Sequence, residues 1–301
     1  MPTSSSAVPE ATSPRVSIGL AVYNGERFLA ATLDSLLAQT FADFELIICD
    51  NASTDRSGEI ATDYAARDRR IRYVRHPVNL GAGANYRHAF EASRAPYFRW
   101  SAADDLYARE SLARCVEVLD REPSVVLTYP QTRLIDEQGS VIRDYDDGLH
   151  LTASRASERF AALLERIGYC NALYGLMRSA ALRKTRLIGD FAGSDIVFQA
   201  ELALYGPFWE IQERLFFRRL HAQASSSMTP EQRRLFYVPA ERRRIFLRHW
   251  RHLSEHARSV WRAPLSVAER MRLARTLARM AVGERDQLLA ELRTAARWLA
   301  A

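Results

Sequence analysis

Short apolar runs alternate with helix-forming segments over the first 130 residues of the chain. The apolar runs are rich in β-branched residues and read as buried strands at residues 16–22, 44–50, 71–76, 97–100 and 125–129. Between them, apolar side chains recur at helical spacing, for example Leu29, Leu33, Leu36 and Leu37. Strands alternating with helices through short connections predict an α/β fold, with a mostly parallel central sheet covered by helices on both faces.

Ligands of such sheets bind at the carboxyl ends of the strands. Four short segments follow predicted strands, and we expect them to lie along one edge. They are Tyr23-Asn24, Asp50-Asn51, the segment from His76 to Gly81, and Asp104-Asp105.

The adjacent acids Asp104 and Asp105 allow two interpretations. An acidic pair after a strand often caps the next helix. A cap needs only one carboxylate, however, and two like charges side by side are stabilised by a cation. Hard oxygen ligands suit Mg²⁺ or Mn²⁺, which would join the pair to a substrate diphosphate.

A second polar cluster is Asp50-Asn51-x-Ser53-x-Asp55. Ser53 looks like the N-cap of the following helix, with Asp55 in its first turn. Asp50 ends an apolar strand and can accept a hydrogen bond from a base or a ribose hydroxyl. The G-x-G-x-x-G and P-loop motifs do not occur in the sequence, which argues against a dinucleotide or P-loop site. The glycines Gly81 and Gly83 could let the backbone approach a ligand.

Three motifs in this order resemble the family 2 glycosyltransferases. They are VSIGLAVYNGERFLAATLDSLLAQTFADFELIICDNASTDRS, NLGAGANYRHAF and YFRWSAADDLY. The resemblance is close from Pro14 to Tyr129. It continues more weakly through GSDIVFQAELALYG and FFRRLHAQASSS to about Ser227. The resemblance implies the GT-A fold, a single Rossmann-like α/β domain that binds a nucleotide sugar.

The resemblance also implies roles for individual residues. Asp104 matches the last Asp of the family's D-x-D motif, although Ala102 stands in place of the first. A metal site of Asp104, Asp105 and His221 for Mg²⁺ or Mn²⁺ follows, with Arg218 or Arg219 near the diphosphate. Asp195 matches the general base. The donor-binding positions are Ala21, Tyr23, Asn24, Asp50, Asn51, Asn79, Gly81, Asn85, Ala103 and Asp104.

The expected activity is that of an inverting hexosyl- or deoxyhexosyltransferase. The donor would be a nucleotide sugar, with a UDP-sugar as first choice, and the acceptor a saccharide or a lipid-linked saccharide in surface polysaccharide or glycolipid synthesis. Two alternatives stay open. A sugar-nucleotide nucleotidyltransferase usually has a Gly-rich, basic loop after the first strand, where this chain reads AVYNGERF. A non-catalytic sugar-nucleotide-binding protein would explain Ala102. A glycosidase would leave the acids and amides of the strand ends without a purpose.

The C-terminal quarter differs from the rest in charge. Residues 231–301 hold 16 Arg and 7 acids, whereas the whole chain has a net charge of only +6. We expect a disordered tail at 1–14, a GT-A domain at 15–227 and a basic helical appendage at 228–301, separated by the polar break SSSMTPEQRR.

An apolar stripe of Phe246, Trp250, Leu253, Ala257 and Val260 predicts one helix of the appendage. Ser266-x-x-Glu269 predicts a capping box for a second helix, which carries Leu273, Leu277 and Met280. A third helix carries Leu288, Leu292, Ala295 and Leu299.

The appendage allows three interpretations. Its stripes could pack on the catalytic domain or form a homodimer contact, with the arginines as a solvated face. Its charge could instead hold the protein on an anionic membrane. Nucleic acid is not expected, because no reader motif is present and Trp250 and Trp261 fall on or beside the stripe.

Other features of the sequence point to the cytoplasm. No apolar run approaches the about 20 residues of a membrane span, and the N-terminus has no secretory signal pattern. The widely spaced Cys49, Cys115 and Cys170 fit buried free thiols in a reducing compartment. We therefore expect a cytoplasmic protein, with peripheral contact at the inner face of the plasma membrane if the appendage binds lipid.

Overall fold

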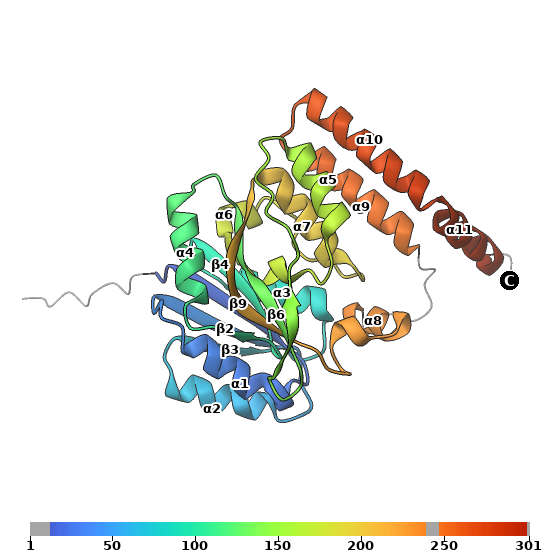
Figure 1. Ribbon diagram of the computed structural model, residues 1–301. Helices are drawn as coiled ribbons and strands as arrows, with labels where there is room; N and C mark the ends of the chain where they lie inside the picture. Colours follow the sequence, from blue (N-terminus) through green and yellow to red (C-terminus); the bar gives the residue numbers. More distant parts are fainter. Residues whose placement is uncertain (1–12, 239–246, 300–301) are drawn as a thin grey trace, which may run out of the picture.

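In a computed structural model of the chain, residues 13–238 and 247–299 are described, and four parallel strands run side by side in its N-terminal half (Figure 1). They lie in the order β3 (Ile71–Arg75), β2 (Phe44–Asp50), β1 (Val16–Val22), β4 (Tyr97–Ala102). This confirms the expected parallel sheet and aligns the carboxyl ends of these strands along one edge, called the strand-end edge below.

The sheet continues beyond β4 as a mixed sheet. Its further strands follow in the order β8 (Leu176–Arg178), β6 (Leu127–Ile135), β9 (Phe208–Arg219) and β5 (Leu106–Tyr107). β8 is antiparallel to β4 and β6, β9 runs parallel to β6, and β7 (Val141–Tyr145) pairs with β6 at the side. The segment expected as a strand or hairpin near residues 208–221 is thus a single strand of 12 residues.

Helices cover both faces of the sheet because alternate strand residues point to opposite sides. One hydrophobic core contains Leu20 and Leu46, and the other contains Ile47 and Trp100. The first lies under α1 (Glu26–Leu37), α2 (Ser57–Arg67) and α4 (Ser111–Arg121). The second lies under α3 (Ala82–Glu91), α5 (Ala156–Arg166), α6 (Ser179–Leu182), α7 (Ser194–Tyr205) and the C-terminal helices.

Aromatic packing fixes the end of β4. The rings of Phe98, Trp100 and Phe198 meet edge to face, with centroids 5.0 and 5.2 Å apart. Trp100 is fully buried and its indole N–H donates to Tyr86 O at 2.8 Å. Each aromatic pair stabilises the fold by about 1 kcal/mol beyond area burial, so the residues that follow Trp100 start from a rigid position.

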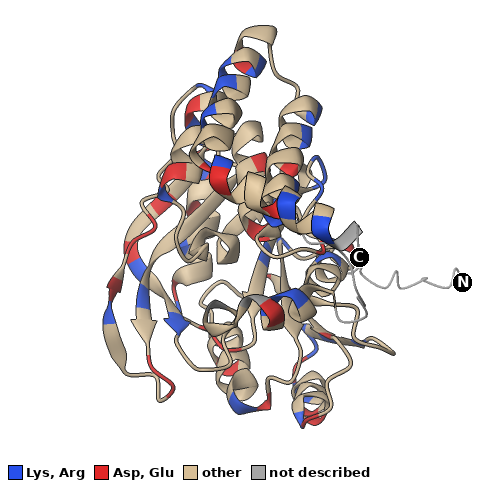
Figure 2. Cartoon of the chain, turned by 90° about the vertical axis from the view of Figure 1, so that its right-hand side faces the viewer, with Lys and Arg blue, Asp and Glu red and all other residues tan. Residues whose placement is uncertain are grey.

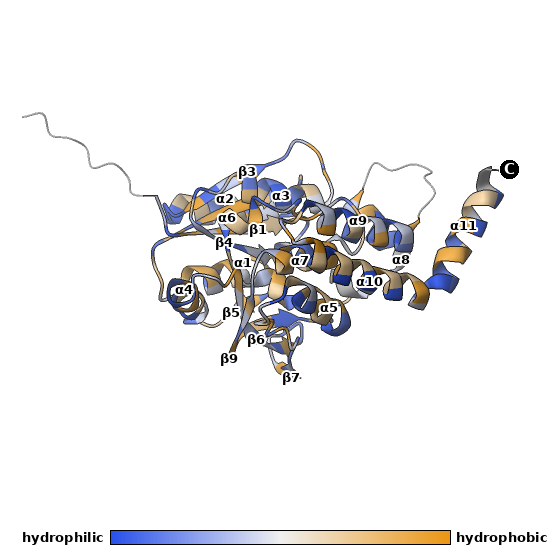
Figure 3. Ribbon diagram, turned by 90° about the horizontal axis from the view of Figure 1, so that it is seen from above, coloured by the Kyte–Doolittle hydropathy of each residue, from blue (hydrophilic) through white to orange (hydrophobic). Residues whose placement is uncertain are grey.

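The chain after β9 is helical. A short turn η2 (Ser225–Ser227) leads to α8 (Pro230–Tyr237), which has a full capping box between Thr229 and Gln232. The sequence stretch expected as a polar break therefore contains a helix. The helices α9 (Arg248–Arg262) and α10 (Val267–Gly283) pack on α7 and α5, and α11 (Arg285–Leu299) projects beyond them (Figure 3).

Two predictions about helix ends need correction. Ser53 is not a cap, because α2 begins at Ser57; its hydroxyl instead accepts from the Asn24 N–H at 3.0 Å. Ser266 does cap α10, but Glu269 does not complete a capping box. Its carboxylate accepts from Ser157 N–H at 2.8 Å, at the start of α5. In both places a long-range contact replaces the local one.

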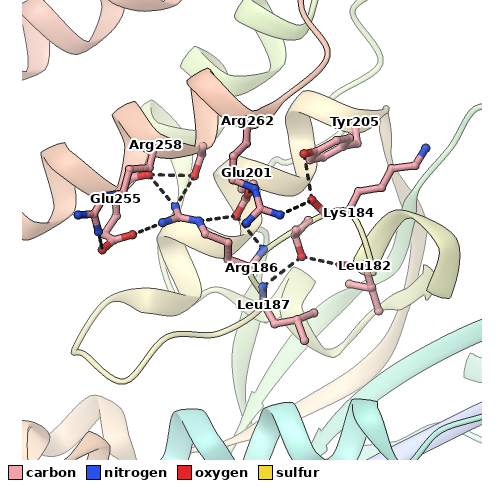
Figure 4. Close-up of polar contacts among 11 residues, drawn as sticks. Leu182, Lys184, Arg186, Leu187, Glu201, Tyr205, Glu255, Arg258 and Arg262 are labelled. Carbon is pink, nitrogen blue, oxygen red and sulfur yellow. Dashed lines mark hydrogen bonds and ion pairs between the residues drawn. The ribbon is translucent and has the colours of Figure 1, made fainter.

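The apolar stripe predicted for α9 is only partly confirmed. Val260 is buried and Leu253 packs against the core, but Ala257 is exposed. The buried face of this helix also includes Glu255, His256 and Ser259. Phe246 lies outside the described residues. The physical reason is Arg186, which forms ion pairs with Glu201 and Glu255 and donates to Ser259 Oγ at 2.9 Å (Figure 4).

Trp261 does not lie on a buried stripe either; it is 75% exposed, with Arg270 over its ring at 5.2 Å. In α11, Leu288 is buried but Leu292 is 43% exposed. In contrast, Leu273 and Leu277 of α10 are buried, as predicted.

The cysteines and the membrane prediction come out as expected. Cys49, Cys115 and Cys170 are free and buried. Within residues 13–238 and 247–299, no helix combines the length and apolar character needed to cross a bilayer. Of the predicted tail at 1–14, residues 1–12 lie outside the described part of the chain.

Candidate active site

Asparagine side chains tie the loops of the strand-end edge together. Asn51 Nδ2 donates to Asn79 Oδ1 at 2.8 Å, and Asn51 Oδ1 accepts from Leu80 N–H at 2.8 Å. Asn24 Oδ1 accepts from Thr54 N–H at 2.8 Å, and Asn85 Nδ2 donates to Cys49 O at 2.9 Å. These amides are engaged within the chain. Their evident contribution is to hold the loops after β1, β2 and β3 in fixed positions.

The two glycines after β3 have different roles. Gly81 adopts φ 87° and its N–H donates to Asn79 Oδ1 at 2.9 Å. At Gly83 a Cβ atom would lie 2.3 Å from Gly189 O. The close backbone approach expected here is therefore made by the chain's own loop before α7.

Three predicted donor positions are open to solvent. Tyr23 is 44% exposed, and Ala21 and Ala103 are half-buried. In the sheet, Ala21 lies between Cys49 of β2 and Ala102 of β4.

Asp50 is fully buried at the end of β2. Its Oδ1 accepts from Ser53 N–H at 2.8 Å, and its Oδ2 accepts from Tyr73 OH at 2.7 Å and Arg75 Nη1 at 3.1 Å. Arg75 is half-exposed. A ligand at this edge therefore meets Arg75 before it meets the carboxylate. Sequence analysis missed Arg75, although the signal was there: it is the last residue of a strand that ends at this edge.

The contact between Asp104 and His221 joins two distant parts of the sequence. Asp104 Oδ2 lies 2.8 Å from His221 Nε2, across 117 positions of the chain. The loop after β4 supplies the acid, and the turn after β9 supplies the imidazole. The next helix, α4, begins at Ser111 with Glu110 as its N-cap residue. The helix-cap interpretation of the acidic pair is therefore wrong.

Asp105 is more buried than Asp104 and has a different partner. It is 3% exposed, and its Oδ1 accepts from Arg219 N–H at 2.9 Å. Burial and the negative charge of Asp104 raise the pKa of Asp105, against the opposing charge of Arg218. Asp105 thus joins the loop after β4 to the end of β9, while the side chain of Asp104 is partly exposed.

The two basic residues at the end of β9 also differ. Arg219 is 4% exposed. Its guanidinium donates hydrogen bonds to the carbonyl oxygens of Asp104, Asp136 and Glu137, each at 2.9 Å. Arg218 is half-buried and donates to Tyr169 O at 2.7 Å. The charges of Asp105 and Asp104 help to raise the pKa of Arg218, although burial lowers it. Both arginines therefore lie close to the acidic pair, and Arg218 is the less buried of the two.

The residues present fit a divalent cation that also binds substrate. Among the described residues, no group of three or more His, Cys, Asp and Glu side chains could hold a metal alone. Mg²⁺ and similar ions, however, are commonly bound by one or two protein ligands plus substrate phosphates. Asp104 and His221 provide such a pair. For His221 Nε2 to bind a cation its proton must sit on Nδ1, which is buried and has no hydrogen-bond partner in the part of the chain described.

Asp195 lies at the start of α7, half-buried, after Gly193 with φ 85°. Its charge, after burial, helps to raise the pKa of the neighbouring Cys170 thiol. Cys170 adopts φ 60°, an uncommon conformation for a non-glycine residue, and such strain is often found at functional sites.

Tyr86 relates Asp195 to the acidic pair. Burial raises the pKa of Tyr86, and so do the charges of Asp104, Asp105 and Asp195. The charges of all three acids thus act on one side chain of α3. Tyr237 of α8 lies close by, since its pKa is raised by burial and then by Asp195 and Tyr86. Sequence analysis missed both tyrosines, because no local pattern distinguishes them from core aromatics.

Residues 17–185 match the family model of Glycosyl transferase family 2, so the chain belongs to this family. It is 29% identical over 140 residues to the uncharacterised glycosyltransferase MJ1057 of Methanocaldococcus jannaschii, covering 46% of this chain and 48% of the relative. It is 40% identical over 104 residues to the uncharacterised glycosyltransferase EpsJ of Bacillus subtilis, covering 35% and 30%. The chain thus spans less than half the length of these relatives.

Solved structures share the fold at low sequence identity. S. aureus TarS 1-349 in complex with UDP-GlcNAc superposes with a TM-score of 0.67 at 17% identity, over 92% of this chain and 79% of TarS. The mannosyltransferase PcManGT from Pyrobaculum calidifontis, in complex with GDP-Man and Mn²⁺, superposes with a TM-score of 0.57 at 15% identity, over 97% and 76%. These likenesses confirm the GT-A-like fold.

Proposed function

We propose that this protein transfers a sugar from a nucleoside diphosphate sugar to an acceptor hydroxyl, with inversion at the anomeric carbon. The observation that carries the proposal is the contact between Asp104 and His221 at 2.8 Å, at the carboxyl end of β4. It places an exposed carboxylate and an imidazole where α/β sheets bind ligands. Membership of glycosyl transferase family 2 favours transfer over the nucleotidyltransferase and non-catalytic alternatives.

The donor nucleotide is proposed to bind along the ends of β1 and β2. The base lies between Tyr23 and Arg75, beside the small residues Ala21 and Ala103, and Asp50 holds Arg75 in place. A UDP-sugar is the first choice, because TarS, which shares the fold, has been solved with UDP-GlcNAc. A GDP-sugar is the second, because PcManGT has been solved with GDP-Man.

The diphosphate is proposed to lie at Asp104, with His221 and Asp104 holding a Mg²⁺ or Mn²⁺ ion. The bound ion would offset the negative charge that grows on the departing nucleoside diphosphate. Arg218, which is held by Tyr169 O and Asn171 Oδ1, adds a fixed positive charge beside the acidic pair. A charge that is already in place needs no rearrangement when the sugar leaves.

Asp195 is proposed as the general base. Its carboxylate takes the proton of the acceptor hydroxyl as the oxygen attacks the anomeric carbon from the face opposite the leaving diphosphate. Inversion follows from this single displacement. The charges of both Asp195 and Asp104 act on Tyr86, which supports placing the base and the leaving group at the same site. The acceptor is proposed to be a saccharide or lipid-linked saccharide in surface polysaccharide or glycolipid synthesis at the cytoplasmic side of the membrane.

The test is release of nucleoside diphosphate from a panel of UDP-, GDP- and dTDP-sugars with Mn²⁺ or Mg²⁺ and saccharide acceptors. Asp104→Ala and His221→Ala should each lower turnover by about 10²-fold or more, since a catalytic metal supplies several kcal/mol. Asp63→Ala, which removes an exposed acid of α2, is the control and should leave turnover unchanged. Full activity in excess chelator, or in Asp104→Ala, would refute the metal role. If no nucleoside diphosphate is released from any donor, the proposal that the protein is a glycosyltransferase is wrong.

A further inference from the structure

Helix α10 carries a second apolar stripe, on its exposed side. Val267, Met271, Ala274, Ala278 and Val282 recur at spacings of four, three, four and four, which places them on one face of the helix. All five are exposed, with Val267 at 75%, Met271 at 54% and Val282 at 66%. Leu273 and Leu277, on the other face, pack against the protein. We call the five exposed residues the outer stripe.

Trp261, in the last turn of α9, lies close to α10. Its ring is 75% exposed, and Arg270 holds it from the α10 side at 5.2 Å. Exposure of the large apolar indole ring to water is unfavourable. At the interface of a bilayer, by contrast, the indole is among the favoured side chains.

Arginines run alongside the outer stripe. Arg272, Arg275 and Arg279 are exposed, at spacings of three and four along the same helix. Arg272 pairs with Glu269 at 2.6 Å, whereas Arg275 and Arg279 make no ion pair or hydrogen bond within the described residues. Over residues 248–299 the chain has eleven arginines and five acids. Figure 2 shows basic residues spread along these helices.

From this arrangement we propose that the outer stripe and Trp261 form a docking surface for an anionic lipid bilayer. A helix with an apolar face flanked by basic residues lies in the membrane interface, with the apolar side chains in the acyl boundary and the charges at the headgroups. Helix α10 has both features: the apolar face is the outer stripe, and Arg272, Arg275 and Arg279 lie beside it. The surface goes beyond the proposed transfer reaction, because none of its residues belongs to the strand-end edge.

Charge decides between this occupant and two others. A second copy docked on the same face would bring Arg275 and Arg279 close to its own arginines, and like charges repel. Nucleic acid would satisfy the arginines but would leave the five apolar side chains without a partner. Only an anionic surface with an apolar interior matches both features.

The experiment measures binding of the full chain to phosphatidylcholine vesicles with and without phosphatidylglycerol, at low and high salt. Binding is expected only with phosphatidylglycerol and should weaken with salt. Arg275→Gln with Arg279→Gln should weaken it about thirtyfold, since each basic residue near such a surface contributes about 1 kcal/mol, a factor of about five. The control pair Arg67→Gln with Arg69→Gln makes the same charge change at exposed positions near the end of α2.

A second pair of variants tests the apolar half. Val267→Ser with Met271→Ser should weaken binding about tenfold or more, by loss of apolar burial. Val141→Ser with Ile142→Ser, which removes two exposed apolar residues of β7, should not. No binding of the unaltered protein to phosphatidylglycerol vesicles at low salt would overturn the proposal. Equal effects of the test and control pairs would also overturn it. So would tighter binding to single-stranded DNA than to vesicles. A dimer seen in sedimentation that dissociates in Val267→Ser with Met271→Ser would assign the surface to a second copy of the chain instead.

Discussion

The strand-end edge and the C-terminal helices differ in what their polar side chains contact. At the edge, Asp104 and Tyr23 are partly exposed, and the buried amides behind them hold only loops. In the C-terminal helices, Glu255, His256 and Ser259 are buried, while Val267, Met271 and Val282 are exposed. At the strand-end edge some polar groups are accessible to a ligand. In the C-terminal helices the buried polar groups bind other parts of the chain.

The comparison shows that partly exposed polar groups serve activity at the strand-end edge, whereas buried polar groups serve stability in the C-terminal helices. A substitution at the edge should change activity with little effect on stability. A substitution in the network around Arg186, which joins α9 to α7 (Figure 4), should change stability with little effect on the folded enzyme's activity.

The largest expected effect is on turnover. Asp195→Asn keeps the size of the side chain and removes its basicity, so turnover should fall by about 10²- to 10⁴-fold. Donor binding, followed by thermal shift with UDP or GDP, should persist. If donor binding disappears together with turnover, Asp195 is a donor ligand or a structural residue.

Arg186→Met should lower the free energy of unfolding by about 3 kcal/mol, because Glu201 and Glu255 lose their least exposed cation. Arg262 and Arg258 remain beside these acids, but both are more exposed to solvent than Arg186. Glu201 is 1% exposed, so water cannot replace the lost partner. Denaturant unfolding measures the change, and Arg275→Met, at an exposed position, is the matched control. Equal midpoints for the two variants would mean that the network does not hold α9 in place.

Acid should destabilise the C-terminal helices through His256. Burial, with the charges of His252 and Arg186, lowers the pKa of His256 from 6.5 to about 3. Between these values the unfolded chain binds a proton that the folded chain does not, so stability falls as the pH falls below 6.5. By linkage the loss is about 2 kcal/mol at pH 5 relative to pH 7.5. Unfolding curves of the unaltered chain and His256→Gln measure it. A pH dependence that is the same in both would assign it to other groups.

The smallest effect concerns the start of α10. Ser266→Ala should cost about 1 kcal/mol through loss of the cap, and Glu269→Ala a similar amount through loss of its contact with Ser157 N–H. Because these are separate contacts, the two losses should add within about 0.5 kcal/mol in the double variant. A larger coupling would indicate a reciprocal capping box after all.

The sequence by itself determined the elements of the N-terminal half, the direction of its strands and the identity of the edge where polar residues gather. Strand and helix periodicities are local, and parallel connection forces the ends of β1, β2, β3 and β4 to one side. The buried thiols and the inner face of α10 were local patterns as well.

Only the tertiary structure decided which groups meet. It brought Asp104 within 2.8 Å of His221, which only the family resemblance had grouped together, and it joined Asp105 to Arg219 and Arg75 to Asp50. It also added buried polar residues to the packed face of α9, because Arg186 reaches that face from a loop far away in the sequence. Such contacts depend on which side chains the packed layers bring within a few ångströms, and no periodicity along a single segment encodes that distance.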